Sequence, residues 1–394
     1  MSFEPPLKKK KSSRLRSMLS SLPDSSLYEF SYPSLGSVLH LDWTSSGFLI
    51  IADALGHVSF WRHVVDDGLE LVRHYRCHAA AISDLALSHD EAYCVSIADG
   101  DSSMCLFDVG TLELISRCNS LPYQPSRAVF LPGPVHKVLI TDINSPNVHV
   151  YDTPFTSNPE PVSTFTPLAS PVFALCSSPS SPLLVFCDEF SLFTVFDVDT
   201  LSPAPSSLTG WVDINTTDLV KLAYRRYVCE WITLSRDASK FAVMTSVGVF
   251  VFSFPSFSMI ASFSVTLQSL AQKTAQEESL LFLSADEWTT RLNKEPSLVE
   301  HVPRPSFRVC FDYSTELVIF STCVGIHICQ LDPARLVSVL GKPEKGLRIA
   351  TMALLQRGDA PVIAAAAVNS NRVYLFTNNE PAEPNPRDPK DIER

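Results

Sequence analysis

The sequence predicts an all-β fold built from one repeated unit, and three observations support this prediction. From about residue 37 to 377, short apolar runs alternate with period two and are separated by Asp, Gly, Ser and Pro turns. Similar strand endings recur along this stretch. Apolar residues make up 45% of the 394 residues and charged residues only 19%, which allows a sizeable core and argues against bulk disorder.

The repeat has seven units. Each ends in a strand with an aromatic or apolar anchor: "HVSFWRHV" (57–64), "SMCLFDVG" (103–110), "NVHVYDTP" (147–154), "LFTVFDVD" (192–199), "GVFVFSFP" (248–255), "GIHICQLD" (325–332) and "NRVYLFTN" (371–378). Without one longer insertion, the spacing is about 41 residues per unit, close to the 40–45 of a WD40 blade. The sequence therefore predicts a seven-bladed WD40 β-propeller.

The second unit carries the most complete blade pattern, "HAAAISDLALSHDEAYCVSIADGDSSMCLFDV" (78–109). His78 precedes the innermost strand and is expected to bond Asp101, which lies in a tight turn six positions before Phe107. Ser96 lies on the intervening strand and is predicted to act as the relay between them. We interpret these four residues as a structural staple, in which a buried imidazole needs a polar partner. A Ser–His–Asp hydrolase is the alternative, but the G-x-S-x-G elbow of such enzymes is missing.

Two other units are expected to have looser turns. The first unit has Leu55 where the turn Asp is expected, and the fifth has no acidic residue in "MTSVGVFVFSF". We expect these blades to depend on strand pairing and apolar packing.

Residues 1–25 are predicted to form a basic flexible arm. Six of the 31 basic residues lie in 1–16 with one acidic residue, so residues 1–16 carry +5 and the rest of the chain −16. The cluster consists of Lys8, Lys9, Lys10, Lys11, Arg14 and Arg16. It predicts a nuclear import signal, or else an arm that touches nucleic acid or a solvated tail without a partner.

The propeller is predicted to span 26–377, followed by a Pro-rich tether at 378–394. The alternating stretch "SLYEFSY" (26–32) is expected to supply the outer strand of the last blade and so close the ring.

Between the fifth and sixth blades, about 264–300 breaks the β pattern and has apolar residues at helical spacing. We predict a helical insertion there. Its candidate partner-binding residues are Leu280, Leu281, Phe282 and Trp288. The alternative is that the helices simply pack on the edge of the propeller.

The composition also limits the possible functions. Ten scattered cysteines without a CxxC pair predict reduced, buried thiols rather than a metal site. We expect no catalytic residues, no metal and no cofactor. The sequence contains no run of 18 apolar residues, so no membrane-spanning helix is predicted. The acidic body argues against direct nucleic-acid specificity and favours protein partners, including basic ones.

Several stretches resemble the peptidylprolyl isomerase domain and WD repeat-containing protein family, the nuclear WD40 cyclophilins. They include "GHVSFWRHVVDDGLELVRHYRCH" (56–78), "WVDINTTDLVKLAYRR" (211–226) and "LGKPEKGLRIATMALLQ" (340–356). The resemblance covers about residues 7–381 and corresponds to the WD-repeat half of the family.

This resemblance implies a nuclear, spliceosome-associated scaffold in pre-mRNA splicing. The family's cyclophilin domain is absent from this sequence, so no isomerase residue is carried over and the chain is expected not to be an enzyme. Two alternatives stay open. One is a propeller that binds histones or chromatin, and the other is a truncated product of an isomerase whose catalytic domain lies beyond this chain.

Overall fold

The computed structural model describes residues 19–23, 28–64, 68–204, 218–219, 222, 225, 227–270, 283–300, 307–341, 348–357 and 360–378. The basic cluster at Lys8–Arg16 lies outside these residues, as does the predicted tether beyond residue 378. The three insert residues Leu280, Leu281 and Phe282 also lie outside them.

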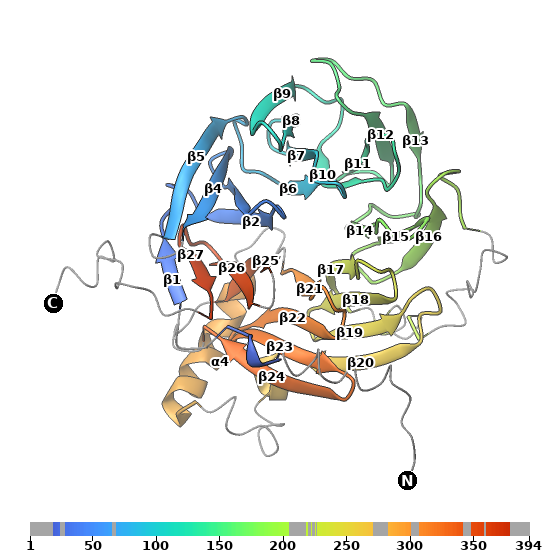
Figure 1. The fold of residues 1–394 in the computed structure, drawn as a ribbon. Helices are drawn as coiled ribbons and strands as arrows, with labels where there is room; N and C mark the ends of the chain where they lie inside the picture. Colours follow the sequence, from blue (N-terminus) through green and yellow to red (C-terminus); the bar gives the residue numbers. More distant parts are fainter. Residues whose placement is uncertain are drawn as a thin grey trace, which may run out of the picture.

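The described strands form seven antiparallel sheets arranged as a ring around a central axis (Figure 1). The first three blades are β2 (Val38–Trp43), β3 (Phe48–Asp53), β4 (His57–Val64), β5 (Gly68–Arg76); β6 (Asp84–Leu87), β7 (Tyr93–Ala98), β8 (Ser103–Asp108), β9 (Glu113–Cys118); and β10 (Pro125–Phe130), β11 (Lys137–Asp142), β12 (Val148–Asp152), β13 (Ser163–Phe165). In each blade the first strand lies innermost. The seven-bladed propeller is therefore confirmed.

The other four blades follow the same order, inner strand first. They are β14 (Ala174–Cys176), β15 (Leu183–Cys187), β16 (Phe193–Asp197); β17 (Cys229–Leu234), β18 (Lys240–Thr245), β19 (Gly248–Ser253), β20 (Met259–Ser264); β21 (Val309–Phe311), β22 (Leu317–Thr322), β23 (Gly325–Leu331), β24 (Ala334–Leu340); and β25 (Ile349–Arg357), β26 (Ala360–Ala367), β27 (Val373–Phe376), β1 (Tyr28–Ser31). Blade 4 has three strands among the described residues, with one further bridge between Phe196 and Pro203.

The ring closes through strand β1. This strand pairs antiparallel with β27, Tyr28 opposite Phe376 and Ser31 opposite Val373. The closure predicted from 26–32 is therefore correct. It joins the two ends of the propeller and protects the edge that the last blade would otherwise expose.

The core is a ring of interfaces between neighbouring blades. The described residues form seven apolar clusters, and each cluster draws its members from two adjacent blades. Such packing follows from the alternation in the strands, which sends side chains to both faces of every sheet. All ten cysteines are unpaired and nine of them are buried, as the sequence predicts.

The turns of the first and fifth blades are closed by hydrogen bonds to the side chain of the residue that ends the second strand. In blade 1, Asp53 Oδ1 accepts from the amides of Leu55 and His57, both at 2.9 Å. In blade 5, Thr245 Oγ1 accepts from the amide of Gly248 at 3.2 Å. In these two blades, the residue that ends the second strand accepts the turn hydrogen bonds that we expected of a residue later in the turn.

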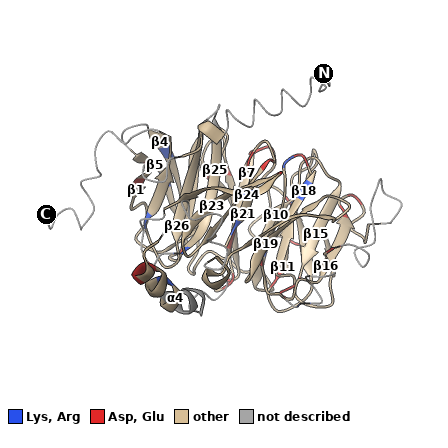
Figure 2. Ribbon diagram, turned by 90° about the horizontal axis from the view of Figure 1, so that it is seen from below, with Lys and Arg blue, Asp and Glu red and all other residues tan. Residues whose placement is uncertain are grey.

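The insertion is helical, as predicted. Helix α4 (Ala285–Glu300) begins with a capping box, because Ser284 Oγ accepts from the amide of Glu287 and the Glu287 carboxylate accepts from the amide of Ser284. Figure 2, which views the ring edge-on, places α4 on one face of the propeller. None of the helices in the described part of the chain is long and apolar enough to cross a membrane.

Helix α4 is fastened to blade 6 rather than standing free. Arg291 is buried and its Nη1 donates to the carbonyls of Cys323 and Val324 at 3.0 and 3.1 Å. Trp288 is half-buried and packs against the apolar cluster between blades 5 and 6. The packing of Trp288, one of the candidate insert residues, therefore agrees with the alternative prediction that the insertion packs on the propeller.

Candidate interaction site in the central channel

The staple residues of blade 2 come together with one addition. His78 Nε2 lies 2.7 Å from Ser96 Oγ, and its Nδ1 contacts Ser103 Oγ. Ser103 Oγ in turn donates to Asp101 Oδ1 at 2.5 Å. The relay between His78 and Asp101 is therefore Ser103, from the "DGDSS" turn, and the prediction that Ser96 fills this role was wrong. Ser96 contacts the other ring nitrogen of His78. Phe107 makes no polar contact in this group and packs on Phe60 with centroids 5.7 Å apart.

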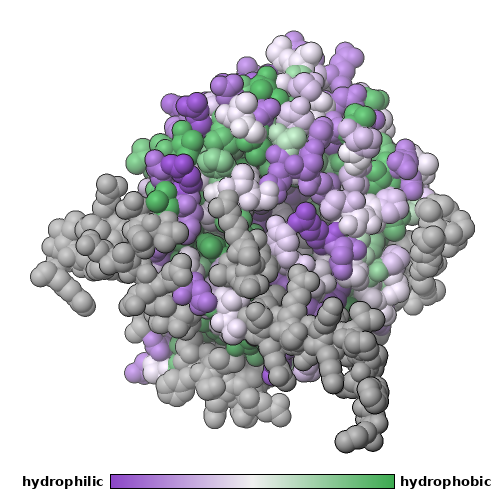
Figure 3. All heavy atoms as spheres, viewed as in Figure 1, coloured by the Kyte–Doolittle hydropathy of each residue, from purple (hydrophilic) through white to green (hydrophobic). Residues whose placement is uncertain are grey.

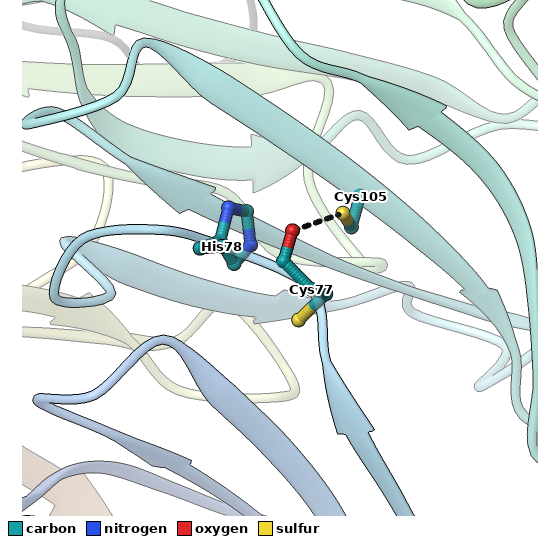
Figure 4. Close-up of side chains that lie close together, drawn as sticks. All are labelled: Cys77, His78 and Cys105. Atoms are coloured by element: carbon teal, nitrogen blue, oxygen red, sulfur yellow. Dashed lines mark hydrogen bonds between the residues drawn. The ribbon is translucent and has the colours of Figure 1, made fainter.

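Next to this staple, Cys77, His78 and Cys105 bring their ligand atoms within 4.8 Å of one another (Figure 4). Both ring nitrogens of His78 already have serine partners. The Cys105 thiol donates to the Cys77 carbonyl at 3.6 Å, as the dashed line in Figure 4 indicates. We assign these three residues to the packing between blades 1 and 2.

A layer of polar and aromatic side chains crosses the central channel. Each blade contributes one residue that lies within the first three residues of its inner strand or directly before it: His40, Asp84, Arg127, Phe173, Glu230, Arg308 and Arg348. All except Phe173 are buried. The signal in the sequence is a charged, polar or aromatic residue near the start of each inner strand. Only the alignment of seven inner strands makes this signal visible.

Arg308 and His40 join blades 6 and 1 within this layer. Arg308 Nη1 donates to the Leu41 carbonyl at 2.9 Å, and Nη2 lies 3.3 Å from His40 Nδ1. His40 Nε2 lies 3.3 Å from the Ile82 carbonyl. Burial, Arg308 and Arg127 hold the pKa of His40 well below its usual range. The imidazole is therefore neutral, with Nε2–H donating to Ile82 and Nδ1 accepting from Arg308.

Arg127 joins blades 3, 4 and 5. Its Nε donates to the Phe173 carbonyl at 3.1 Å, and its guanidinium lies 5.3 Å from the centre of the Trp231 ring. The guanidinium of Arg308 lies 5.0 Å from the same ring. Trp231 thus interacts with two cations, an arrangement in which the negative face of the aromatic ring attracts each guanidinium.

These residues line a pocket of about 180 Å³ in the channel. Its walls come from the inner strands of blades 1 to 5 and from Arg308, and the charged members are Asp42, Asp84, Arg127 and Arg308. Figure 3 views the ring along its axis and shows hydrophilic residues around a hollow near the centre of this face. The arrangement can bind a small polar group.

Glu230 and Arg348 form the remaining charged pair of the layer. Glu230 Oε2 lies 3.6 Å from Arg348 Nη2, and both side chains are more than nine-tenths buried. Burial raises the pKa of Glu230 to about 7, although the Arg348 charge works in the opposite direction. Desolvation of the carboxylate therefore outweighs its ion pair.

We expect Glu230→Gln to flatten the dependence of stability on pH between about 4.5 and 7. The folded protein keeps the Glu230 proton up to a higher pH than the unfolded chain does. The free energy of unfolding therefore falls as the pH rises through this window, and the whole loss is present above the window. Since one pKa unit corresponds to about 1.4 kcal/mol, the total is on the order of 3 kcal/mol. Thermal unfolding at pH 5 and pH 8 measures it. An equal difference between variant and wild type at both pH values would contradict the assignment.

A second surface lies on neighbouring loops of blades 4 and 5. Phe190, Leu192, Val228 and Val247 are all exposed, Phe190 by 53%. Their loops are held together by hydrogen bonds from the Cys229 amide to the Glu189 carbonyl and from the Ser246 amide to the Val228 carbonyl, at 2.9 and 3.0 Å. We call these four residues the rim patch. Grouped exposed apolar side chains of this kind are typical of protein interaction sites.

Comparison with known proteins places this propeller among its relatives. No protein-family profile matches the chain. The peptidylprolyl isomerase domain and WD repeat-containing protein 1 of Mus musculus is 26% identical over 397 residues, which cover 93% of this chain and 60% of that protein. The peptidyl-prolyl cis-trans isomerase CYP71 of Arabidopsis thaliana is 26% identical over 396 residues, covering 93% and 62%.

The chain is a WD40 propeller related to the peptidylprolyl isomerase domain and WD repeat-containing proteins. It spans about 60% of the length of these curated relatives. The β-propeller domain of Cps50 (Swd1) from Myceliophthora thermophila superposes with a TM-score of 0.60 at 14% identity, covering 89% of this chain and all of that domain. This second likeness supports the fold alone.

Proposed function

We propose that this propeller is a non-catalytic protein-interaction scaffold in the nucleus, associated with the spliceosome in pre-mRNA splicing. The observation that carries the proposal is the relationship, over 93% of the chain, to proteins named for a peptidylprolyl isomerase domain and WD repeats. The basic cluster at Lys8–Arg16 supports import into the nucleus.

The rim patch supports binding of a protein partner. Its four apolar side chains lie on loops at one end of neighbouring blades, where propellers present variable segments on a rigid frame. We propose that this patch makes the main contact with a splicing factor, since exposed aromatic and aliphatic residues supply the binding energy of most protein interfaces.

The test is an affinity pull-down of the tagged chain from nuclear extract, with and without RNase, read by mass spectrometry. We expect splicing factors to dominate the captured proteins and to survive RNase. A double variant, Phe190→Ser with Leu192→Ser, is expected to lose most of them. Val135→Ser is the matched control, because Val135 is 58% exposed in the β10–β11 loop at the opposite end of the blades.

The outcomes separate the candidate partners. Capture of histones without splicing factors would replace the splicing proposal with a chromatin-binding function. Equal capture by the rim variant and the wild type would exclude the patch as the contact. Removal of 264–300 is a poor variant for this purpose, because Arg291 and Trp288 stabilise blade 6 and its neighbour.

A further inference from the structure

Two arginines of the channel pocket, Arg127 and Arg308, have no described carboxylate within salt-bridge distance, although Asp84 acts on both of them at longer range. Arg348 has Glu230 within 4.0 Å, but the ion pairs between described residues include neither Arg127 nor Arg308. Arg127 is only 3% exposed, and its Nη2 has no hydrogen-bond partner among the described residues. The Nε of Arg308 is in the same situation. A buried charged donor without an acceptor is unfavourable, so an acceptor that enters the pocket is strongly favoured.

The two acidic residues of the pocket do not supply that acceptor. Asp84 uses one oxygen for the Leu85 amide at 2.9 Å and the other for the Ala128 amide at 3.0 Å. Asp42 Oδ1 accepts from the amide of Trp43 at 2.9 Å. Burial raises the pKa of both Asp42 and Asp84, against the opposing influence of the arginines.

A basic group would fit the pocket poorly. Trp231 could attract a lysine or arginine side chain, but Arg127 and Arg308 already lie 5.3 and 5.0 Å from its ring centre. An incoming cation would meet two fixed guanidinium groups in a desolvated site, where repulsion is stronger than in water. The channel pocket therefore favours an anionic group over a cationic one, although the whole chain has a net charge of −11.

We propose that the channel pocket binds an oxyanion on a partner peptide, either a Glu or Asp carboxylate or a phosphoryl group, with Arg127 Nη2 donating to it. The inference rests on the proposed function, since it names the chemistry by which the scaffold recognises a partner. A guanidinium is suited to this task because its planar donors match carboxylate and phosphate oxygens. A volume of about 180 Å³ suits one side chain rather than a helix, which is about 10 Å wide.

The proposal can be tested with the purified chain and labelled peptides in fluorescence anisotropy. Four otherwise identical Gly/Ser-rich peptides carry Glu-Glu, phosphoserine, Gln-Gln or Lys-Lys at their centre. We expect the Glu and phosphoserine peptides to bind and the Gln and Lys peptides to bind at least tenfold more weakly. The order of the four affinities is measured on the wild-type chain alone. It distinguishes a carboxylate ligand from a phosphoryl ligand. The affinity should also fall as salt is added.

Variants locate the site. Arg127→Gln should lower the affinity for the tighter-binding acidic peptide by about 10- to 100-fold, the range expected for a lost charged hydrogen bond. The affinity of Arg127→Lys should lie between those of the wild type and Arg127→Gln, because lysine keeps the charge but loses the planar guanidinium donors. Arg73→Gln is the charge-matched control, because Arg73 is exposed on the outer strand β5. Circular dichroism melts check that each variant is folded.

Three results would overturn the proposal. They are equal binding of all four peptides, preference for the Lys peptide, and unchanged binding of the acidic peptide by folded Arg127→Gln. Tighter binding of a single-stranded oligonucleotide than of any peptide would also overturn it, in favour of a nucleic-acid ligand. These titrations use purified components, so their failure is distinct from failure of the pull-down, which reports on splicing factors and the rim patch.

Discussion

Substitution of Gly325 with alanine is expected to destabilise the propeller by about 3 kcal/mol or more. Gly325 opens strand β23 with φ of +147°, a backbone conformation that side chains disfavour. A Cβ atom there would lie 2.2 Å from the Leu340 carbonyl oxygen. That oxygen belongs to the neighbouring strand β24, so the pairing inside blade 6 would have to shift. Chemical denaturation monitored by circular dichroism measures the loss.

Gly133→Ala is the matched control. Gly133 has a similar φ of +141°, but a Cβ atom there would meet nothing within 4 Å. We expect it to cost only the backbone strain, about 1–2 kcal/mol. The difference between the two variants isolates the collision with β24. If both variants lose the same stability, the close approach at Gly325 is not present in solution.

Phe107→Ala is expected to cost about 3–5 kcal/mol, the usual range for a fully buried phenylalanine. Phe107 is 0% exposed in the cluster between blades 1 and 2. Its ring packs on Phe60 and on Tyr75, with centroids 5.7 and 5.5 Å away. Its removal would leave a cavity at the interface of two blades and weaken the ring there.

Phe190→Ala deletes the same side chain from an exposed position and serves as the comparison. We expect its free energy of unfolding to stay within about 0.5 kcal/mol of the wild type. Equilibrium unfolding in urea gives both values. Comparable losses in the two variants would contradict the assignment of Phe107 to a rigid core.

The predicted staple shows how far local pattern carries a prediction. His78, Ser96 and Asp101 could be placed in one group because strand order and turn position follow from the repeat. Ser103 could not be, because the choice between a direct contact and a relay depends on side-chain positions of a few tenths of an ångström. The same limit applies to Trp288, whose helix could be predicted but whose packing partner could not.

By itself, the sequence determined the seven blades, their third strands and the closure by 28–31, because alternation and turn residues act over short distances along the chain. Only the tertiary structure decided the channel layer. Arg127, Trp231 and Arg308 lie on three different blades and meet only when the ring closes. Their charges are then desolvated together, and this desolvation distinguishes a candidate binding site from ordinary polar residues on strands.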